Sequence, residues 1–589
     1  MDRHHSTHPS SNDGSDSDSP ASNPGRAVAS RLKKGSACVE CRSRKKRCDG
    51  KRPICSPCLR EKRECTHDES KSRSRTRTQD LMNRVEELQS KLSELQVQAS
   101  QASAAAARQR QQLKVPSRQG TPSSSSLSSG MTAHLATGEW WMQDPPPRPI
   151  QKHLLEISVA QRHRFLLPFH LAQFWESVYS SSPPLPALLN AMYLLACYYS
   201  GNPLLVCLEM HYVARVRKML AESLGARSTS LVQWIQASTF LAFYLSCRGR
   251  YLEARHELAG VVPILMLCKL HTIRSSVVQP FDDDDAEAPS LLPPPKDDFE
   301  VGERICVFWM AYHIDLLVAL ICGLPPNKAL ITETTTVWPR TFEEYDQGFD
   351  PATDGSVQSL FGTNPARPFS PPCSMLALRM KASAIHGRVS LFAMSCTADY
   401  ARMPEFFARL ENYHRIVAAF MERLPPLAYD PSTNEEIVVP PSPVHFTIFS
   451  VRTANLGTFI QLYNAAGLDL NAYDELYRRR LLMAREATAL ARTFLMMKLP
   501  IRCLSMNCTL AWFPVSRVIA QHARKVSLEG NYNEMEQSQA DLATMMEALK
   551  EASSTYPYFA FQLDRLRAYV NGGSEEDLST HAAVPMTMY

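Results

Sequence analysis

Six cysteines near the amino terminus constrain the fold of this chain more than any other feature. Their spacing is C-x2-C-x6-C-x6-C-x2-C-x6-C, and they are Cys38, Cys41, Cys48, Cys55, Cys58 and Cys65. Thiolates are soft ligands that hold zinc in a tetrahedron, and a C-x2-C pair can reach one ion from a single turn. Two separate tetrahedral sites need eight ligands, so six cysteines complete two sites only if two sulfurs are shared. The spacing therefore favours a binuclear zinc cluster.

A bound metal would also allow so short a segment to fold. Its aliphatic side chains are almost limited to Val39, Ile54 and Leu59, too few for a core. Structural zinc supplies roughly 10–16 kcal/mol of folding free energy in finger peptides near neutral pH. The alternatives are disulfides and an iron–sulfur site. The polar first 25 residues lack the apolar core of a signal peptide, which argues against disulfides, and iron–sulfur spacings usually differ.

Positive charge is concentrated on the cysteine segment and its flanks. Residues 26–77 contain 18 Lys or Arg against 6 Asp or Glu, a formal charge of +12, whereas the whole chain carries +5. The remainder of the chain is therefore acidic. A basic module of this kind suits the phosphate backbone of double-stranded DNA.

The cysteine segment resembles the DNA-binding module of the fungal binuclear zinc-cluster transcription factors. The resemblance rests on the six-cysteine spacing, the basic first loop and Pro53 shortly before the fourth cysteine. It implies two Zn²⁺ ions, with Cys38 and Cys55 as bridges. One ion would be held by Cys38, Cys41, Cys48 and Cys55, and the other by Cys55, Cys58, Cys65 and Cys38.

The resemblance also implies which side chains contact DNA. In the family, a short helix after the second cysteine enters the major groove at its end and reads a CGG-type triplet. Carried over, the DNA-binding residues are Arg42, Arg44, Lys45, Lys46, Arg47, Arg60 and Lys62. Arg44 and Lys45 would read bases, whereas the others would contact phosphates, which position the module without specifying sequence.

A heptad pattern follows the basic linker. Its apolar residues are Leu81, Val85, Leu88, Leu92 and Leu95, with spacings that alternate between four and three. Leu at d with a β-branched residue at a favours a parallel two-stranded coiled coil. The alternative is a helix packed on its own chain. The family keeps its dimerisation helix at this place, so we expect a homodimer that reads two half-sites.

The remaining sequence predicts a large all-α domain. Apolar residues recur at helical spacing from about residue 151, and glycine, at 22 of 589 residues, is about half its usual share. The Pro- and Asp-rich stretch Pro280–Asp298 is where such a domain would divide into lobes. The predicted organisation is a disordered N-terminus (1–30), the zinc binuclear cluster (31–68), a basic linker (69–80), a coiled-coil helix (81–98), a disordered linker (99–150), the helical domain (151–570) and a flexible tail (571–589).

Two stretches of the helical region resemble the middle homology domain of the same fungal regulators. One runs from Gly249 to His271 and the other from Glu303 to Pro325. The resemblance implies a regulatory domain that acts on the transcription machinery or co-regulators and can respond to a small-molecule effector, which the sequence does not name. We interpret Arg304, Trp309 and Asp315 as packing or internally paired groups, since a buried acid usually needs a partner.

Enzyme and membrane functions find no support in the sequence. His256-Glu257 begins an H-E-x-x-H motif, but Gly260 replaces its second histidine, and the phosphate-binding glycine motifs and G-x-S-x-G are absent. We expect no catalytic residues. The apolar stretch 307–324 is interrupted by His313 and Asp315, so we expect no membrane span.

The sequence therefore predicts a nuclear, zinc-dependent regulator of RNA polymerase II transcription that binds specific DNA sequences. The basic clusters Lys33-Lys34 and Arg44–Arg47 are of the kind that import receptors read. The alternative is a non-specific DNA tether or scaffold that recruits protein partners. Candidate acidic activation segments are 282–287 and 572–589, and the sequence does not separate an activator from a repressor.

Overall fold

The computed structural model describes residues 37–67, 90–91, 135, 138–162, 170–225, 230–279, 290–361, 374–397, 399–425, 427, 443–465, 474–498, 501 and 504–578. The chain forms two compact units, residues 1–122 and 123–589. The predicted coiled-coil positions from Leu81 to Leu95 lie outside the described residues.

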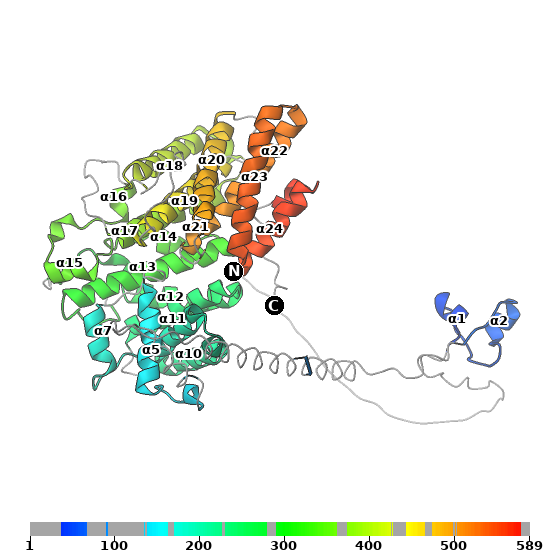
Figure 1. Ribbon diagram of the computed structural model, residues 1–589, viewed down its shortest axis with the longest axis horizontal. Helices are drawn as coiled ribbons and strands as arrows, with labels where there is room; N and C mark the ends of the chain where they lie inside the picture. Colours follow the sequence, from blue (N-terminus) through cyan, green and yellow to red (C-terminus); the bar gives the residue numbers. More distant parts are fainter. Residues whose placement is uncertain are drawn as a thin grey trace, which may run out of the picture. The chain divides into compact units, whose positions relative to one another are not determined.

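Segment 37–67 of the first unit contains two short helices. They are α1 (Val39–Ser43) and α2 (Ser56–Arg60), drawn in blue in Figure 1. Each begins directly after a cysteine, and the two halves repeat with an offset of 17 residues. The N–H of Arg42 donates to the Cys38 carbonyl at 3.0 Å, and that of Leu59 donates to the Cys55 carbonyl at 2.9 Å. The two halves that repeat the cysteine spacing therefore also repeat the same backbone structure.

The second unit is helical, as predicted. Its first helices are α5 (Arg148–Ala160), α7 (Leu171–Val178), α8 (Pro186–Ser200), α9 (Pro203–Val206), α10 (Glu209–Leu224), α11 (Leu231–Cys247), α12 (Tyr251–Leu267), α13 (Asp298–Ile321), α14 (Lys328–Thr332), α15 (Phe342–Gln347) and α16 (Val357–Phe361). They are followed by α17 (Met375–Ser395), α18 (Pro404–Glu422), α19 (Pro443–Asn464), α20 (Asp474–Met496), α21 (Met506–Leu510), α22 (Trp512–Glu529), α23 (Tyr532–Ser553) and α24 (Pro557–Val570). Within the described ranges, β structure is limited to one isolated bridge, Val337 with Ser356.

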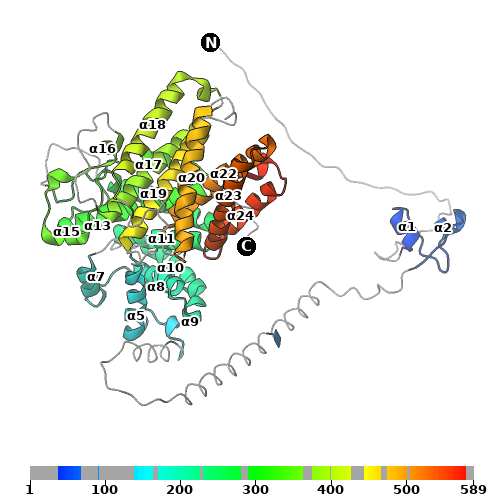
Figure 2. The ribbon, with the colours of Figure 1, turned by 45° about the horizontal axis from the view of Figure 1, so that its top comes forward.

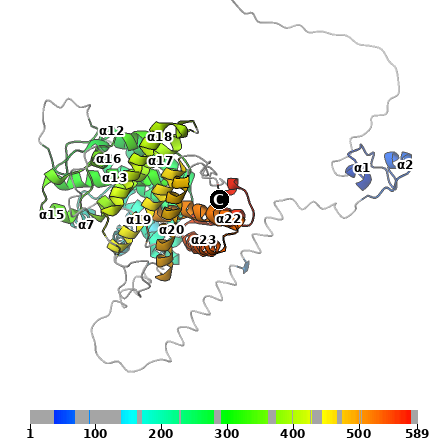
Figure 3. The ribbon, with the colours of Figure 1, turned by 90° about the horizontal axis from the view of Figure 1, so that it is seen from above.

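Helix α13 lies in the middle of this unit. Figure 1 shows α10, α11 and α12 on one side of it and α17 to α20 on the other, and Figure 2 shows the same for α10 and α11. Figure 3 shows α22 and α23 packed side by side. Among the described helices, α13 is the one long and apolar enough to span a membrane, and 94% of its most apolar window is buried inside the fold. Its hydrophobic residues therefore form protein core.

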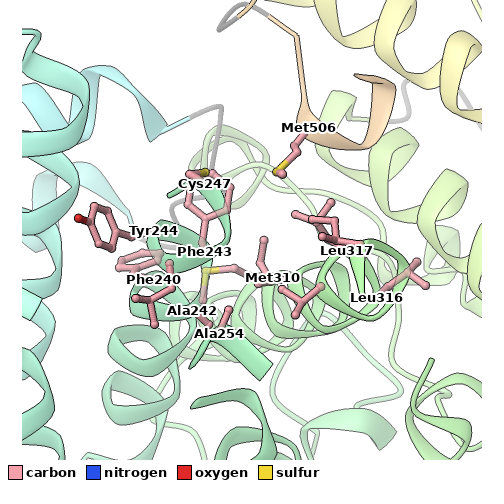
Figure 4. Packing of buried hydrophobic residues seen from close by; sticks show 14 of the residues in the cluster. Phe240, Ala242, Phe243, Tyr244, Cys247, Ala254, Met310, Leu316, Leu317 and Met506 are labelled. Atoms are coloured by element: carbon pink, nitrogen blue, oxygen red, sulfur yellow. The ribbon is translucent and has the colours of Figure 1, made fainter. Parts of the chain in front are cut away.

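The core does not divide where the sequence suggested. One hydrophobic cluster runs from Leu135 to Leu578 and includes residues on both sides of Pro280–Asp298. Figure 4 shows why: Phe240 and Phe243 of α11, Met310 of α13 and Met506 of α21 lie in the same cluster. A second, smaller cluster is formed mainly by α17, α18 and α19. The helical region therefore does not divide at Pro280–Asp298, because α13 packs against helices from both sides of that stretch, and the two clusters share α17 and α19.

Both ends of the helical unit extend beyond the predicted limits of 151 and 570. Before α5, Trp140 is buried, and the Arg215 guanidinium donates to the Trp141 carbonyl at 2.6 Å. After α24, Leu578 is fully buried, and Glu575 accepts hydrogen bonds from Tyr569 and Gln521. Two tryptophans and one leucine thus draw parts of the polar flanking segments into the fold.

Candidate zinc cluster and DNA-binding surface

The structure brings the six predicted cysteines into one cluster. Cys38, Cys41, Cys55 and Cys58 are between 0 and 4% exposed, and Cys48 and Cys65 are half-buried at its edge. No aliphatic core surrounds them, since Val39, Ile54 and Leu59 are all exposed. The sulfur atoms themselves are therefore the interior of the first unit.

The sulfur spacing fits tetrahedral zinc. A Zn–S bond of about 2.3 Å places two sulfurs of one tetrahedron about 3.8 Å apart. The Cys38 Sγ lies 3.7 Å from the Cys55 Sγ and 3.8 Å from the Cys58 Sγ, and the Cys41 Sγ lies 3.7 Å from the Cys55 Sγ and 3.8 Å from the Cys58 Sγ. All four distances are far longer than a disulfide bond, and those of Cys38 to Cys55, Cys38 to Cys58 and Cys41 to Cys55 suit sulfurs that share a metal ion.

Two four-sulfur groups can be drawn within the cluster. One consists of Cys38, Cys41, Cys48 and Cys55, and the other of Cys38, Cys55, Cys58 and Cys65. Within each group all sulfur atoms lie within 4.8 Å of one another. Both groups contain Cys38 and Cys55, the two residues that the sequence comparison suggested as bridges.

Each half of the module caps the helix of the other. The N–H of Val39 at the start of α1 donates to the Thr66 carbonyl at 2.9 Å, and the N–H of Ser56 at the start of α2 donates to Asp49 Oδ1 at 3.0 Å. Asp49 and Thr66 occupy equivalent places in the two halves. The hydrogen bond from Ser56 lowers the pKa of Asp49. These exchanged caps hold the two cysteine loops together.

The thiols do not ionise equally before a metal binds. Burial raises the pKa of Cys41 to about 12 and also raises that of Cys55. Burial opposes ionisation of Cys38 as well, but hydrogen bonds from the Cys41 N–H and neighbouring thiols outweigh it and lower its pKa to about 6. Zinc bound to this cluster would therefore displace protons from several thiols.

Three of the basic side chains on the surface of the module are held in ion pairs. The two oxygens of Glu61 accept from Arg44 at 3.0 Å and from Lys46 at 2.7 Å. Arg63 lies 3.5 Å from Glu61 and 3.5 Å from Glu40, and Glu40 lies 3.9 Å from Arg44. We call these five residues the Glu61 network. It places Arg44, a predicted base reader, against a carboxylate of the other half.

The other predicted contact residues differ in their surroundings. Arg42 donates to the Ala37 carbonyl at 3.2 Å. In the described segment 37–67, Lys45, Arg47, Arg60 and Lys62 are exposed and form no ion pair. The structure therefore separates the basic residues into a paired and an unpaired set.

Lys45 and Lys62 share an unusual backbone conformation. Their φ angles are 51° and 50°, in the left-handed region that favours glycine. Each lysine follows its helix, and the next N–H turns back to a cysteine carbonyl: Lys46 to Cys41 and Arg63 to Cys58, both at 3.0 Å. Glycine would adopt this conformation with less strain than lysine does.

Sequence reasoning missed the acidic members of the network, Glu40 and Glu61. A signal was present in the 17-residue repeat. It pairs Lys45 with Lys62 and Lys46 with Arg63, but it pairs Arg44 with Glu61. Charge is reversed at two repeated positions, Arg44 with Glu61 and Arg47 with Glu64, and within segment 37–67 the first of these two pairs forms an ion pair.

In the helical unit, the three residues weighed as ligand contacts serve packing. The Trp309 indole N–H donates to the Val337 carbonyl at 2.8 Å, and its ring stacks on Trp338. Asp315 is buried and accepts from Arg255 at 2.6 Å. Arg304 donates to the Pro293 carbonyl at 2.8 Å and to Glu300. Each of the three side chains thus has a polar partner inside the fold, in agreement with the packing interpretation, although the buried Nε of Arg304 has no hydrogen-bond partner among the described residues.

Comparison with protein families agrees with this geometry. Residues 36–74 match the fungal Zn(2)-Cys(6) binuclear cluster domain, and residues 159–414 match the fungal specific transcription factor domain. The chain carries both domains of a fungal zinc-cluster transcription factor. Neither a curated protein nor a solved structure matches it significantly.

The match to the cluster domain identifies the cysteine module of this fungal zinc-cluster transcription factor as zinc-binding. The two matches together identify the protein as a regulator of transcription. Both matched families are families of transcription factors rather than enzymes, and they imply a nuclear protein.

Proposed function

We propose that the protein regulates RNA polymerase II transcription by binding specific DNA sequences through its zinc cluster. The observation that carries the proposal is the joint placement of six clustered sulfurs and ten Lys or Arg side chains, among them the seven proposed DNA contacts, on the 31 described residues 37–67. A metal-built module of this size places cations at fixed positions, whereas a basic tail would not. Fixed positions are what base-edge recognition requires.

Two Zn²⁺ ions would be held by the two four-sulfur groups, with Cys38 and Cys55 in both. The ions would neutralise the thiolates and supply the folding free energy that the exposed aliphatic residues cannot provide. The chain's own part is to orient the sulfurs through the exchanged helix caps at Val39 and Ser56. The proposed module is thus stable only with metal.

DNA contact would divide between the two sets of basic residues. Arg44 and Lys45 are proposed to read a CGG-like triplet, since an arginine fork can donate to both guanine O6 and N7. Arg42, Lys46, Arg47, Arg60 and Lys62 would contact phosphates. The heptads between Leu81 and Leu95 support a homodimer on paired half-sites.

The helical unit would transmit regulation rather than catalyse a reaction. Its proposed partners are co-regulators or the transcription machinery, with a small-molecule effector as a further input. We propose that the protein acts in the nucleus. The basic cluster Arg44–Arg47 supports this proposal, because it is of the kind that nuclear import receptors recognise.

Selection from random double-stranded DNA tests the proposal. The full-length, zinc-loaded protein is incubated with the pool at several stated salt concentrations, because phosphate contacts weaken as salt rises. Paired CGG-like triplets at one spacing are the expected result. Enrichment of a single triplet would contradict the homodimer but would still support base reading by Arg44 and Lys45. Binding without enrichment, weakening evenly with salt, would favour the non-specific tether and contradict the proposal.

A further inference from the structure

The two sets of basic residues on the zinc cluster differ in what they can offer to DNA. Lys45, Arg47, Arg60 and Lys62 form no ion pair in the described segment 37–67, so their charges face phosphates without competition. The charges of Arg44, Lys46 and Arg63 are opposed by carboxylates in the Glu61 network. Of its two acids, Glu61 makes the shorter contacts, 2.7 and 3.0 Å.

Glu61 joins the two halves of the module through these contacts. It follows α2 as its C-terminal cap residue, whereas Arg44 follows α1 as the equivalent cap residue. One carboxylate oxygen accepts from Arg44 and the other from Lys46. Arginine and lysine side chains lose rotamer freedom when they are bound in this way, and fixing them before DNA arrives reduces the entropy lost on binding.

We propose that Glu61 is a specificity-determining residue of the DNA-binding surface. Its carboxylate positions Arg44 and Lys46 and withholds their charges from indiscriminate phosphate contact. This inference rests on the proposed DNA-binding function.

Electrostatics gives the direction of the effect. Non-specific binding consists almost entirely of phosphate contacts, so a carboxylate beside two cations weakens it directly. Specific binding also gains base-edge hydrogen bonds, for which a fixed guanidinium is favoured. Glu61 therefore weakens binding to random DNA more than binding to the specific site. The repulsion between its carboxylate and the DNA phosphates thereby raises specificity.

Glu64 offers a matched control in the same loop. It is exposed and, in segment 37–67, forms no ion pair. Glu64→Gln changes the net charge of the protein as Glu61→Gln does, but it releases no cation. Any difference between the two variants therefore reports the Glu61 network rather than total charge.

The test compares full-length, zinc-loaded wild type, Glu61→Gln and Glu64→Gln on the selected DNA site and on a random duplex across a salt series. For Glu61→Gln we expect about fivefold tighter binding to the random duplex, less than about twofold tighter binding to the selected site, a steeper salt dependence and therefore about a threefold lower specificity ratio. For Glu64→Gln we expect an unchanged ratio. Equal behaviour of the two variants on both DNAs would overturn the inference.

Two further arms separate the alternatives. If Glu61→Gln loses zinc, Glu61→Asp is tested in its place, because it keeps the charge on a shorter side chain that cannot span both cations. A specificity ratio of Glu61→Asp below that of the wild type supports the inference, and an unchanged ratio overturns it. Should the wild type prefer no sequence, the proposed function fails. In that case the salt dependence of binding to random DNA still tests the role of Glu61. A steeper slope for Glu61→Gln than for Glu64→Gln supports the claim that Glu61 withholds cations from phosphates, and equal slopes reject it.

Discussion

The zinc cluster and the helical unit are stabilised by different interactions. In the cluster, the most buried side chains are four cysteines, and the nearby aliphatic residues Val39, Ile54 and Leu59 are exposed. In the helical unit, α13 buries Phe308, Trp309 and most of its other residues among neighbouring helices. The first fold depends on sulfur and metal, and the second depends on apolar surface removed from water.

The two units also differ in how they treat charge. The cluster keeps its ion pairs on the surface, where each is worth about 0–1 kcal/mol and where the partners can exchange for DNA. The helical unit buries some of its charges with dedicated partners, such as Asp315 with Arg255. Surface pairs can tune binding, whereas buried pairs mainly fix the fold.

Metal removal should give the largest difference between the units. Adding a zinc chelator should unfold residues 37–67, because no apolar core replaces the metal, and should leave the helical unit intact. Limited trypsin digestion checks this: cleavage at the many Lys and Arg residues of the cluster should accelerate, while the helical circular dichroism signal persists. Loss of helical signal at the same chelator concentration would show that the two folds are coupled.

Breaking the buried ion pair should destabilise only the helical unit. Asp315→Ala leaves Arg255 without its carboxylate in a largely buried place, so we expect a loss of about 3 kcal/mol in unfolding free energy. Denaturant unfolding of the helical signal measures it, with zinc content unchanged. Asp399→Ala is the control, since its pair with Arg402 is exposed and should contribute almost nothing.

Acid should weaken the helical unit through its buried histidines. Burial lowers the pKa of His313 to about 3 and that of His386 to about 4, from an ordinary value of 6.5. The unfolded chain therefore binds more protons between these values and pH 6.5, and stability falls as pH drops below about 6.5.

At pH 4.5 the loss should be about 2 kcal/mol for each of these histidines. His313→Asn should flatten the dependence of unfolding free energy on pH, and His256→Asn, at an exposed position, should not. An equally steep pH profile in the His313 variant would reject this account of the buried imidazole.

The smallest effect is expected at the left-handed lysines. Lys62→Gly relieves the backbone at φ 50° and removes one cation. We expect equal or slightly higher resistance of the cluster to chelation, together with a few-fold weaker DNA binding and a salt slope lower by about one unit. Fluorescence anisotropy in a salt series measures the slope. An unchanged slope would mean that Lys62 does not contact phosphate.

The cysteine spacing was enough to predict the cluster, because ligand number and tetrahedral geometry leave few solutions. Helical periodicity was likewise enough to predict the class of the second unit. The Glu61 network was not predicted, since it depends on the 17-residue repeat bringing α1 and α2 together. The ends at Trp140 and Leu578, and the core that continues across Pro280–Asp298, were missed for a related reason: tertiary packing, not local composition, decides where a helical fold begins, ends and divides.

Native mass spectrometry of the full-length protein tests the central claim most directly, because it counts the metal ions that build the cluster. We predict two zinc ions per chain. We further predict that Cys55→Ser, at a sulfur common to both groups, loses more zinc than Cys48→Ser, which belongs to one group only. A single ion in the wild type, or equal zinc loss in the two variants, would contradict a shared-sulfur binuclear cluster.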